Sequence, residues 1–225
     1  MNITTQLRNG LLLTMLATAC SGAFAAESAD LAVKGVIRPS ACSIALSNNG
    51  TVDYGTISAK SLSATDVTKL PDRDVTMTIN CEAATKVGFQ VADNRAGTAA
   101  PILNNVDPSV LDLAGYGLGA VDGKNLGAYG IKVLPADAVG DGAAVGGNSY
   151  SLDGDTLWQP ASELGNYTFG QIFAWSDTDG GTPNSYKTIS QVLRIVGGLN
   201  STANLPALTS NVELDGSATI SVVYL

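Results

Sequence analysis

The sequence contains no histidine, and only 14% of its 225 residues are charged. Without histidine the chain has no Ser-His-Asp triad, no Cys-His dyad and no imidazole ligand for zinc or haem. The charge is also one-sided, with 12 basic against 20 acidic residues and a net charge of −8. A chain this acidic is repelled by a phosphate backbone, so nucleic acid is not an expected partner. We therefore expect a protein that is not an enzyme and that uses no cofactor and no metal.

Long apolar runs are also scarce, and none reaches the roughly 20 residues that a membrane-spanning helix needs. Residues 1–25 nevertheless have the order of a secretory signal peptide, with Arg8 first, a short apolar stretch next and small residues at the end. We expect cleavage between Ala25 and Ala26, with export through the inner membrane to the periplasm and then to the cell surface. Acylation of Cys20 in a lipoprotein-type signal stays open as the alternative.

Cysteine occurs three times, and Cys42 and Cys81 remain after cleavage. In an oxidising compartment, two cysteines favour a structural disulfide. The alternatives are a metal site or a reactive thiol, but two thiolates without histidine make a poor metal site, and no cation directly flanks either residue. A disulfide would close a loop of about 40 residues and stabilise the fold by roughly 4 kcal/mol.

What the sequence does contain is alternation of apolar and polar residues with a period of two. In the clearest segment Val75, Met77 and Ile79 share one face with Cys81, while threonines and Asn80 occupy the other. Similar patterns predict further strands, at 31–38, 51–55, 86–91, 127–134, 167–175, 188–196 and 218–225.

Segments rich in Gly, Asn, Asp and Pro separate these strands. Loops are expected at 94–112, 135–156 and 176–186, with one short turn of helix within 101–113. No linker or internal repeat is visible, so the pattern predicts one domain over 26–225. Many short strands separated by turns are typical of an all-β, antiparallel sandwich.

The segment 218–225 is the most informative of the predicted strands. Ala218, Ile220, Val222 and Tyr224 lie on one face of it. A terminal segment this apolar needs a pairing partner to stay ordered. It is either the last strand of a closed sandwich or an edge strand that another polypeptide pairs with by β-augmentation.

Several blocks of the sequence resemble pilin subunits of chaperone–usher fimbriae. These blocks are 35–44 around Cys42, 51–55, 75–81 up to Cys81, and 222–225 with the penultimate aromatic Tyr224. Two further blocks, Asp93-Asn94-Arg95-Ala96-Gly97 and Leu214-Asp215-Gly216-Ser217-Ala218-Thr219, are similar to the β-fimbrial major subunits of Gram-negative bacteria. Together the blocks bracket residues 31–225.

The resemblance implies an immunoglobulin-like, pilin-type sandwich that lacks its last strand, so that a groove stays open beside the C-terminal strand. A periplasmic chaperone fills this groove, and at an outer-membrane usher the N-terminal extension of another pilus subunit replaces the chaperone. The implied strand-pairing residues are Ala218, Ile220, Val222, Tyr224 and Leu225, whose carboxylate would be the anchor. The Cys42–Cys81 disulfide would tie the first two core strands together.

Two features depart from the pilin pattern. Only residues 26–30 precede the first predicted strand, and they lack the alternating hydrophobic residues of a donor. In addition, Gly216 stands closer to the penultimate aromatic than the usual pilin glycine. We therefore expect a chain that accepts a donor strand better than it donates one, with a closed sandwich as the alternative.

Other groupings point weakly to ligands. The acidic segments 153–155 and 177–181 resemble pieces of calcium loops, but neither continues into the twelve-residue pattern, so solvated turns are expected. Glu163 is the best candidate for a glycosidase acid, yet no spacing selects a second carboxylate. Glycines at 115, 117, 119, 123 and 127 lack the strand–helix context of a phosphate loop.

Aromatic residues offer the runner-up function. A sugar-stacking platform could be built from Trp158, Trp175, Tyr167 and Tyr186, although core positions are the commoner use of such residues. The corresponding alternative is a soluble periplasmic or surface carbohydrate-binding β-sandwich with a closed fold and host or surface glycans as partners.

Overall fold

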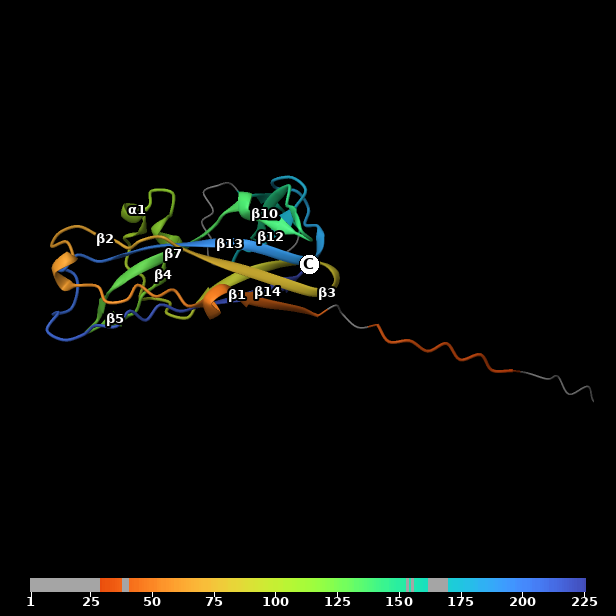
Figure 1. Ribbon diagram of the computed structural model, residues 1–225, viewed down its shortest axis with the longest axis horizontal. Coiled ribbons are helices and arrows are strands. Elements are labelled where there is room, and N and C mark those ends of the chain that lie inside the picture. The colour runs from red at the N-terminus through yellow and green to blue at the C-terminus, as the bar shows by residue number, and fades with distance from the viewer. Residues whose placement is uncertain (1–28, 38–40, 153, 155, 162–169) are drawn as a thin grey trace, which may run out of the picture. The chain divides into compact units, whose positions relative to one another are not determined.

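The computed structural model describes residues 29–37, 41–152, 154, 156–161 and 170–225 (Figure 1). The chain divides into two compact units, Met1–Arg38 and Pro39–Leu225. The predicted signal peptide, its cleavage site at Ala25 and Ala26, and Cys20 lie outside the described residues. Within the described ranges no helix is long and apolar enough to cross a membrane.

The regular secondary structure described in the second unit is almost wholly β-strand, and the described strands pair antiparallel, which confirms the predicted all-β fold class. The strands are β1 Cys42–Leu46, β2 Thr68–Lys69, β3 Arg73–Asp93, β4 Tyr116–Gly117, β5 Ala120–Val121, β6 Lys124–Asn125, β7 Gly127–Val133, β8 Val139–Gly140, β9 Ala143–Ala144, β10 Gly147–Ser151, β11 Gln159–Pro160, β12 Ile172–Ser176, β13 Ser185–Leu199 and β14 Ala218–Tyr224. The helical elements are α1 Leu103–Val106 and 3-10 turns at Ser47–Gly50, Ala59–Ser61, Asp112–Ala114 and Pro135–Asp137.

Strand β3 organises both sheets. Its first half pairs with β1 on one edge and with β13 on the other. Its second half pairs with β14 on one edge and with β12 on the other. The sheets continue from β13 to β7 and β4, and from β12 to β10 and β11. Figure 1 shows β3 bending at one end of the molecule, so that its two halves contribute to two layers.

The core confirms this layered arrangement. Met77 and Ile79 from the first half of β3 belong to the same buried cluster as Val87 and Phe89 from its second half. Trp175 of β12 lies at the centre of the core and is fully buried. A polar group inside must be hydrogen-bonded, and the Trp175 Nε1–H donates to Gln191 Oε1 at 3.0 Å. Apolar burial between the two sheets stabilises this arrangement.

Several predicted strands are confirmed and others are corrected in extent. The segments 127–134, 188–196 and 218–225 correspond to β7, β13 and β14. The segments 75–81 and 86–91, predicted as separate strands, are one continuous β3. The segment 167–175 is found as β12, beginning at Ile172, with 162–169 outside the described residues.

Two predicted strands are wrong. The strand predicted at 31–38 is not formed in its described part, because residues 29–37 contain no strand, and Leu31, Val33 and Ile37 are 90%, 89% and 100% exposed. Alternation makes a segment competent for pairing, but a strand forms only where a partner supplies the ladder. Residues 51–55 are not a strand either, because the Gly55 N–H bonds to Asp53 Oδ1 at 2.7 Å and turns the chain.

The predicted loop 135–156 contains strands that the sequence pattern did not indicate, above all β10. This strand consists of Gly, Asn, Ser and Tyr residues, which have little apolar alternation. It is held between β11 and β12, and its Ser149 and Ser151 are fully buried. At Gly147 a Cβ atom would lie 2.1 Å from the Thr178 carbonyl carbon, so close backbone packing explains the glycine. The short helical turn expected within 101–113 is present as α1.

The Cys42–Cys81 disulfide is confirmed. The two residues are directly opposite one another in the β1–β3 ladder, with their Cα atoms 4.0 Å apart. This short separation is typical of a non-hydrogen-bonded pair, the position that suits a disulfide between adjacent antiparallel strands. The bond fixes the start of β1 against the middle of β3.

Replacing both cysteines tests how much this bond contributes. Because the disulfide closes a loop with a sequence separation of 39 residues, we expect the Cys42→Ala/Cys81→Ala variant to lose about 4 kcal/mol of unfolding free energy. Denaturant titration of the oxidised chain and of the variant measures the difference. A loss below about 1 kcal/mol would contradict a structural role for the disulfide.

An ion pair holds the α1 region against β7. Lys132 Nζ donates to Asp107 Oδ2 at 2.9 Å and to Ser109 Oγ at 2.8 Å. Partial burial raises the pKa of the Asp107 carboxyl, but hydrogen bonds from Ser109 and Lys132 outweigh this and lower it from 3.8 to about 2. Asp107 therefore stabilises the fold when it is ionised.

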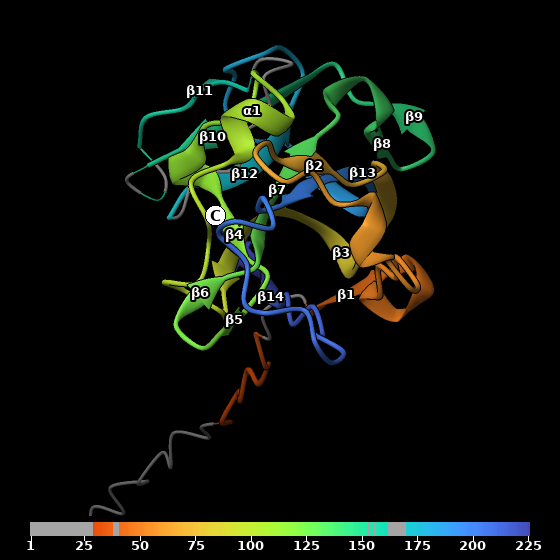
Figure 2. The same cartoon turned by 90° about the vertical axis from the view of Figure 1, so that its left-hand side faces the viewer.

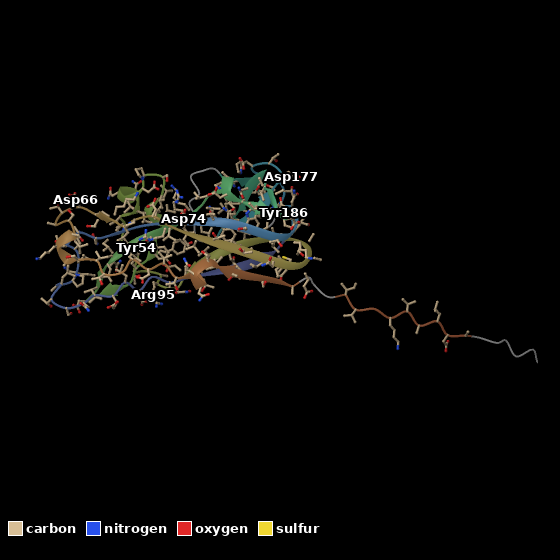
Figure 3. All side chains as sticks on the ribbon, viewed as in Figure 1. Tyr54, Asp66, Asp74, Arg95, Asp177 and Tyr186 are labelled. Atoms are coloured by element: carbon tan, nitrogen blue, oxygen red, sulfur yellow. A yellow bond between two sulfur atoms is a disulfide. The ribbon has the colours of Figure 1, made fainter. Side chains whose placement is uncertain are left out.

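The pH dependence of stability tests this pair. A carboxyl whose pKa is lower in the folded chain contributes stability above its unfolded pKa and loses it as the pH falls. We expect the unfolding free energy to drop between pH 3.8 and about 2, and Asp107→Asn to flatten that drop. Thermal unfolding at stepped pH measures it, with the exposed Asp66, labelled in Figure 3, as the matched Asp66→Asn control. Equal curves for Asp107→Asn and the unchanged chain would refute the assignment.

Candidate strand-pairing edge

Strand β14 lies at the margin of its sheet. It pairs with β3 from Ala218 opposite Asp93 to Tyr224 opposite Val87. Among the described strands no other one pairs with β14. One edge of the C-terminal strand is therefore left without a partner in that part of the chain.

The ladder shows which residues face the unpaired edge of β14. The bonds from Asn94 N–H to Ser217 O, 2.9 Å, and from Leu225 N–H to Lys86 O, 3.2 Å, mark residues 217 and 225 as bonded to the β3 side. Because such positions alternate in an antiparallel ladder, the even-numbered residues between them direct their N–H and C=O groups to the open edge. These residues are Ala218, Ile220, Val222 and Tyr224.

The side chains at these positions face the core without being covered by it. Ala218, Ile220 and Val222 pack against the main core cluster, yet each is only half-buried. A core-facing aliphatic side chain is normally buried, since burial of each CH₂ is worth about 0.8 kcal/mol. The open edge therefore coincides with apolar surface that one more strand would cover.

Strand β1 repeats the arrangement on the other sheet. The Glu82 N–H bonds to Ala41 O at 3.0 Å, so the N–H and C=O groups of Cys42, Ile44 and Leu46 point away from β3. Their side chains are also half-buried against the main core cluster. β1 and β14 contact one another and lie next to each other in both views (Figure 1, Figure 2).

We call these two strands and their outward-facing groups the β1/β14 edge. It is defined by Cys42, Ile44, Leu46, Ala218, Ile220, Val222 and Tyr224. Among the described strands, β1 and β14 thus each leave one edge unpaired at the same margin of the sandwich, and both strands expose apolar side chains there.

A clasp of polar side chains holds the beginning of β14. Arg95 donates from Nε and Nη2 to the two carboxylate oxygens of Asp215, both at 2.7 Å. Asn94 Nδ2 donates to Ser217 Oγ and Thr219 Oγ1, both at 3.0 Å. The hydrogen bond from Arg95 lowers the pKa of Asp215, and the same bond raises the pKa of Arg95. The clasp fixes β14 on β3 while leaving its outer edge open.

The other end of β14 is held by backbone and side-chain bonds together. The Tyr224 hydroxyl accepts the N–H of Cys42 at 2.8 Å, and the Tyr224 side chain is 53% exposed. Tyr224 therefore bridges to β1 in the structure. The Leu225 N–H bonds to Lys86, and anchoring through the Leu225 carboxylate stays a prediction.

The N-terminal segment offers a candidate strand to pair with such an edge. Leu31, Val33, Gly35 and Ile37 occupy alternate positions, and the side chains of Leu31, Val33 and Ile37 are exposed. The expectation that only residues 26–30 precede the first strand is thus wrong, because residues 29–37 belong to no strand. Residues 31–37 carry the alternating hydrophobic residues that 26–30 lack.

The aromatic and acidic residues considered above as ligand-binding candidates serve the fold wherever the structure describes them. Trp175 is fully buried and cannot stack on a sugar, while Trp158 and Tyr186 are half-buried. Asp179 Oδ1 accepts the Asn148 N–H at 3.0 Å, and Asp177 Oδ1 accepts the Asn184 side-chain amide. Figure 3 places Asp177 and Tyr186 far from Arg95 of the clasp.

The described residues contain no group of three or more Cys, Asp or Glu placed to hold a metal ion. At Gly127 a Cβ atom would lie 2.2 Å from the Gly198 carbonyl oxygen, so this glycine serves close strand packing in β7. Tyr167, Glu163 and the acidic residues Asp153 and Asp155 lie outside the described residues.

Comparison with known proteins gives one family and two relatives. A family described as "Protein of unknown function (DUF1120)" matches residues 31–130. The uncharacterized protein YhcF of Escherichia coli K12 is 28% identical, over 96% of this chain and 98% of YhcF. Protein GltF of the same organism is 26% identical, over 93% of this chain and 94% of GltF. The family match includes the free N-terminal segment, β1 and β3.

Removing the clasp tests whether it holds β14 in place. We expect Arg95→Ala to speed amide exchange at residues 217–219, because the Asp215 carboxylate loses its bidentate partner. Hydrogen exchange followed by mass spectrometry measures the effect. The matched control is Arg194→Ala, which breaks the equally bidentate pair with Asp74 between β13 and β3. Equal exchange at 217–219 in both variants would contradict the clasp.

Proposed function

We propose that this protein is an exported structural subunit of a fimbria, assembled when a strand from another polypeptide pairs with the groove beside β14. The observation that carries the proposal is the β1/β14 edge, where Ala218, Ile220 and Val222 face the core but stay half-buried. An added strand would bond to their outward N–H and C=O groups and cover their side chains.

An edge of this kind is a hazard for a protein that works alone. Unpaired strands with apolar side chains promote aggregation, and soluble proteins usually block them with charge, proline or a bulge. Strand β14 has none of these over Ala218–Tyr224. The clasp of Arg95 and Asp215 instead keeps the strand in position, which suits an edge that is meant to be paired.

The donor would be the N-terminal segment of a second copy. Residues 31–37 match the seven residues of β14 in length, and Leu31, Val33 and Ile37 would face the core from alternate positions. Gly35 falls on the same face and adds no side-chain bulk. The same chain thus carries a segment suited to each side of the contact.

The proposed partners follow from the exposure of this edge before assembly. A periplasmic chaperone would cover it after export, and an outer-membrane usher would exchange the chaperone for the next subunit. The signal-peptide pattern of residues 1–25 and the Cys42–Cys81 disulfide support passage through an oxidising periplasm. The acidic surface would keep unassembled subunits apart by charge repulsion.

Complementation between two defective variants tests the proposal. Val33→Asp places a carboxylate on the core-facing side of the donor, and Val222→Asp places one on the acceptor edge. Because an unpaired buried carboxylate costs about 3 kcal/mol, each variant should associate with itself about 100-fold more weakly than the unchanged chain. An equal mixture should form a heterodimer, since Val222→Asp keeps its donor and Val33→Asp keeps its acceptor. Sedimentation after refolding measures both.

Matched controls place the same charge on the other face. Ala32→Asp in the segment and Ser221→Asp in β14 put the carboxylate on the solvent side of the added pair. These variants should associate as the unchanged chain does. Unimpaired self-association of Val33→Asp, or equal loss in all four variants, would refute the proposal.

A further inference from the structure

The Tyr224 side chain joins the two strands of the β1/β14 edge. Its hydroxyl accepts the N–H of Cys42 at 2.8 Å, across 182 positions of sequence. That N–H is one of the outward-pointing amides of β1. The bond therefore occupies a group that an added strand would otherwise be free to use.

Both ends of this bridge are fixed to β3. Cys42 is held by its disulfide to Cys81 and by the Ala41–Glu82 backbone bond beside it. Tyr224 is held by the ladder of β14 and by the Leu225 N–H bond to Lys86. A hydrogen bond between two fixed points loses little conformational freedom when it forms, so it persists in the free chain.

The bridge stands at one end of the edge. β1 runs from Cys42 opposite Cys81 to Leu46 opposite Met77, and β14 reaches Val87 at Tyr224. The residues nearest the bend of β3 are thus Cys42 and Tyr224. The remaining edge residues, Ala218 to Val222 and Ile44 to Leu46, extend away from the bridge.

We propose that the Tyr224–Cys42 bond closes this end of the β1/β14 edge and sets where an inserted strand stops. The inference rests on the proposed function and adds the register of pairing to it. An inserted strand bonds to Ala218, Ile220 and Val222 and ends before Tyr224, whose side chain spans the gap between the two strands. Pairing beyond Val222 requires the tyrosine to rotate away and to release the Cys42 N–H.

Tyr224→Phe isolates the hydroxyl, because the ring is kept and only the bond to Cys42 is lost. In the free variant we expect the Cys42 amide to exchange about fivefold faster, as a hydrogen bond of about 1 kcal/mol is removed. With an inserted strand, we expect protection to extend by one outward-facing residue, from Val222 to position 224. Both effects are local to the edge.

NMR of the isotope-labelled chain measures both effects, the exchange of the Cys42 amide and the protection at position 224, residue by residue. The chain is refolded with and without excess unlabelled peptide of residues 29–41 of this sequence. In the unchanged chain the peptide should protect the amides of Ala218, Ile220 and Val222 but not that of Tyr224. The matched control Tyr150→Phe removes a hydroxyl that donates to Gln159 Oε1 at 3.1 Å, and it should behave as the unchanged chain.

The outcomes separate this inference from the proposed function. Protection that already includes Tyr224 in the unchanged chain would overturn the stop while leaving strand pairing intact. Equal Cys42 exchange in the unchanged chain and Tyr224→Phe would also overturn it, whatever the peptide does. Absence of protection at Ala218, Ile220 and Val222 in every variant would overturn strand pairing and the stop together.

Discussion

The backbone ladder of β3 determines where every other part of the sandwich lies. Its first half carries β1 and β13 and its second half carries β14 and β12, so the bend between the halves folds one strand into two layers. The core forms between those layers. Because β1 and β14 are both bonded to β3 and to no further sheet strand among the described ones, the same bend brings two unpaired edges to one margin. The disulfide and the Arg95–Asp215 clasp then fix those edges in place.

This arrangement links the composition of the chain to its proposed function. A sequence without histidine and with few charges has little to offer acid–base chemistry, but it supplies alternating aliphatic residues in abundance. Those residues are buried along β3, half-buried along β14 and exposed in residues 31–37. The three segments share one alternating pattern but differ in pairing. β3 is paired on both edges, β14 is paired on one edge, and residues 31–37 are paired on neither. In the proposed assembly, β14 would become paired on both edges and residues 31–37 would become paired on the edge that faces β14.

Strong local patterns allowed much of the fold to be predicted. The alternation of Val75 to Cys81 and of Ala218 to Tyr224 is confirmed because period and β-propensity agree there, and the predicted Cys42–Cys81 disulfide is also confirmed. Strand β10 was missed because its residues are polar and small, and the neighbouring strands impose its conformation. The pattern of residues 31–38 predicts a strand, but residues 31–37 form none because the described chain supplies no partner for them. The clasp and the Tyr224 bridge join residues 120 or more positions apart, and spacing carries no such information.

Cross-linking between copies that each carry one added cysteine, with the Cys42–Cys81 disulfide kept, tests the central claim most directly, namely that residues 31–37 of one copy pair with the outer edge of β14 in another. Ser221 points to the outer face of β14, so in the proposed pairing Ala32 and Lys34 share its face and Val33 does not. Copies carrying Ser221→Cys are mixed with copies carrying Ala32→Cys, Lys34→Cys or Val33→Cys, refolded and oxidised. The account predicts disulfide-linked dimers with position 32 or 34 and none with position 33. Dimers from all three mixtures alike, or from none, would contradict it.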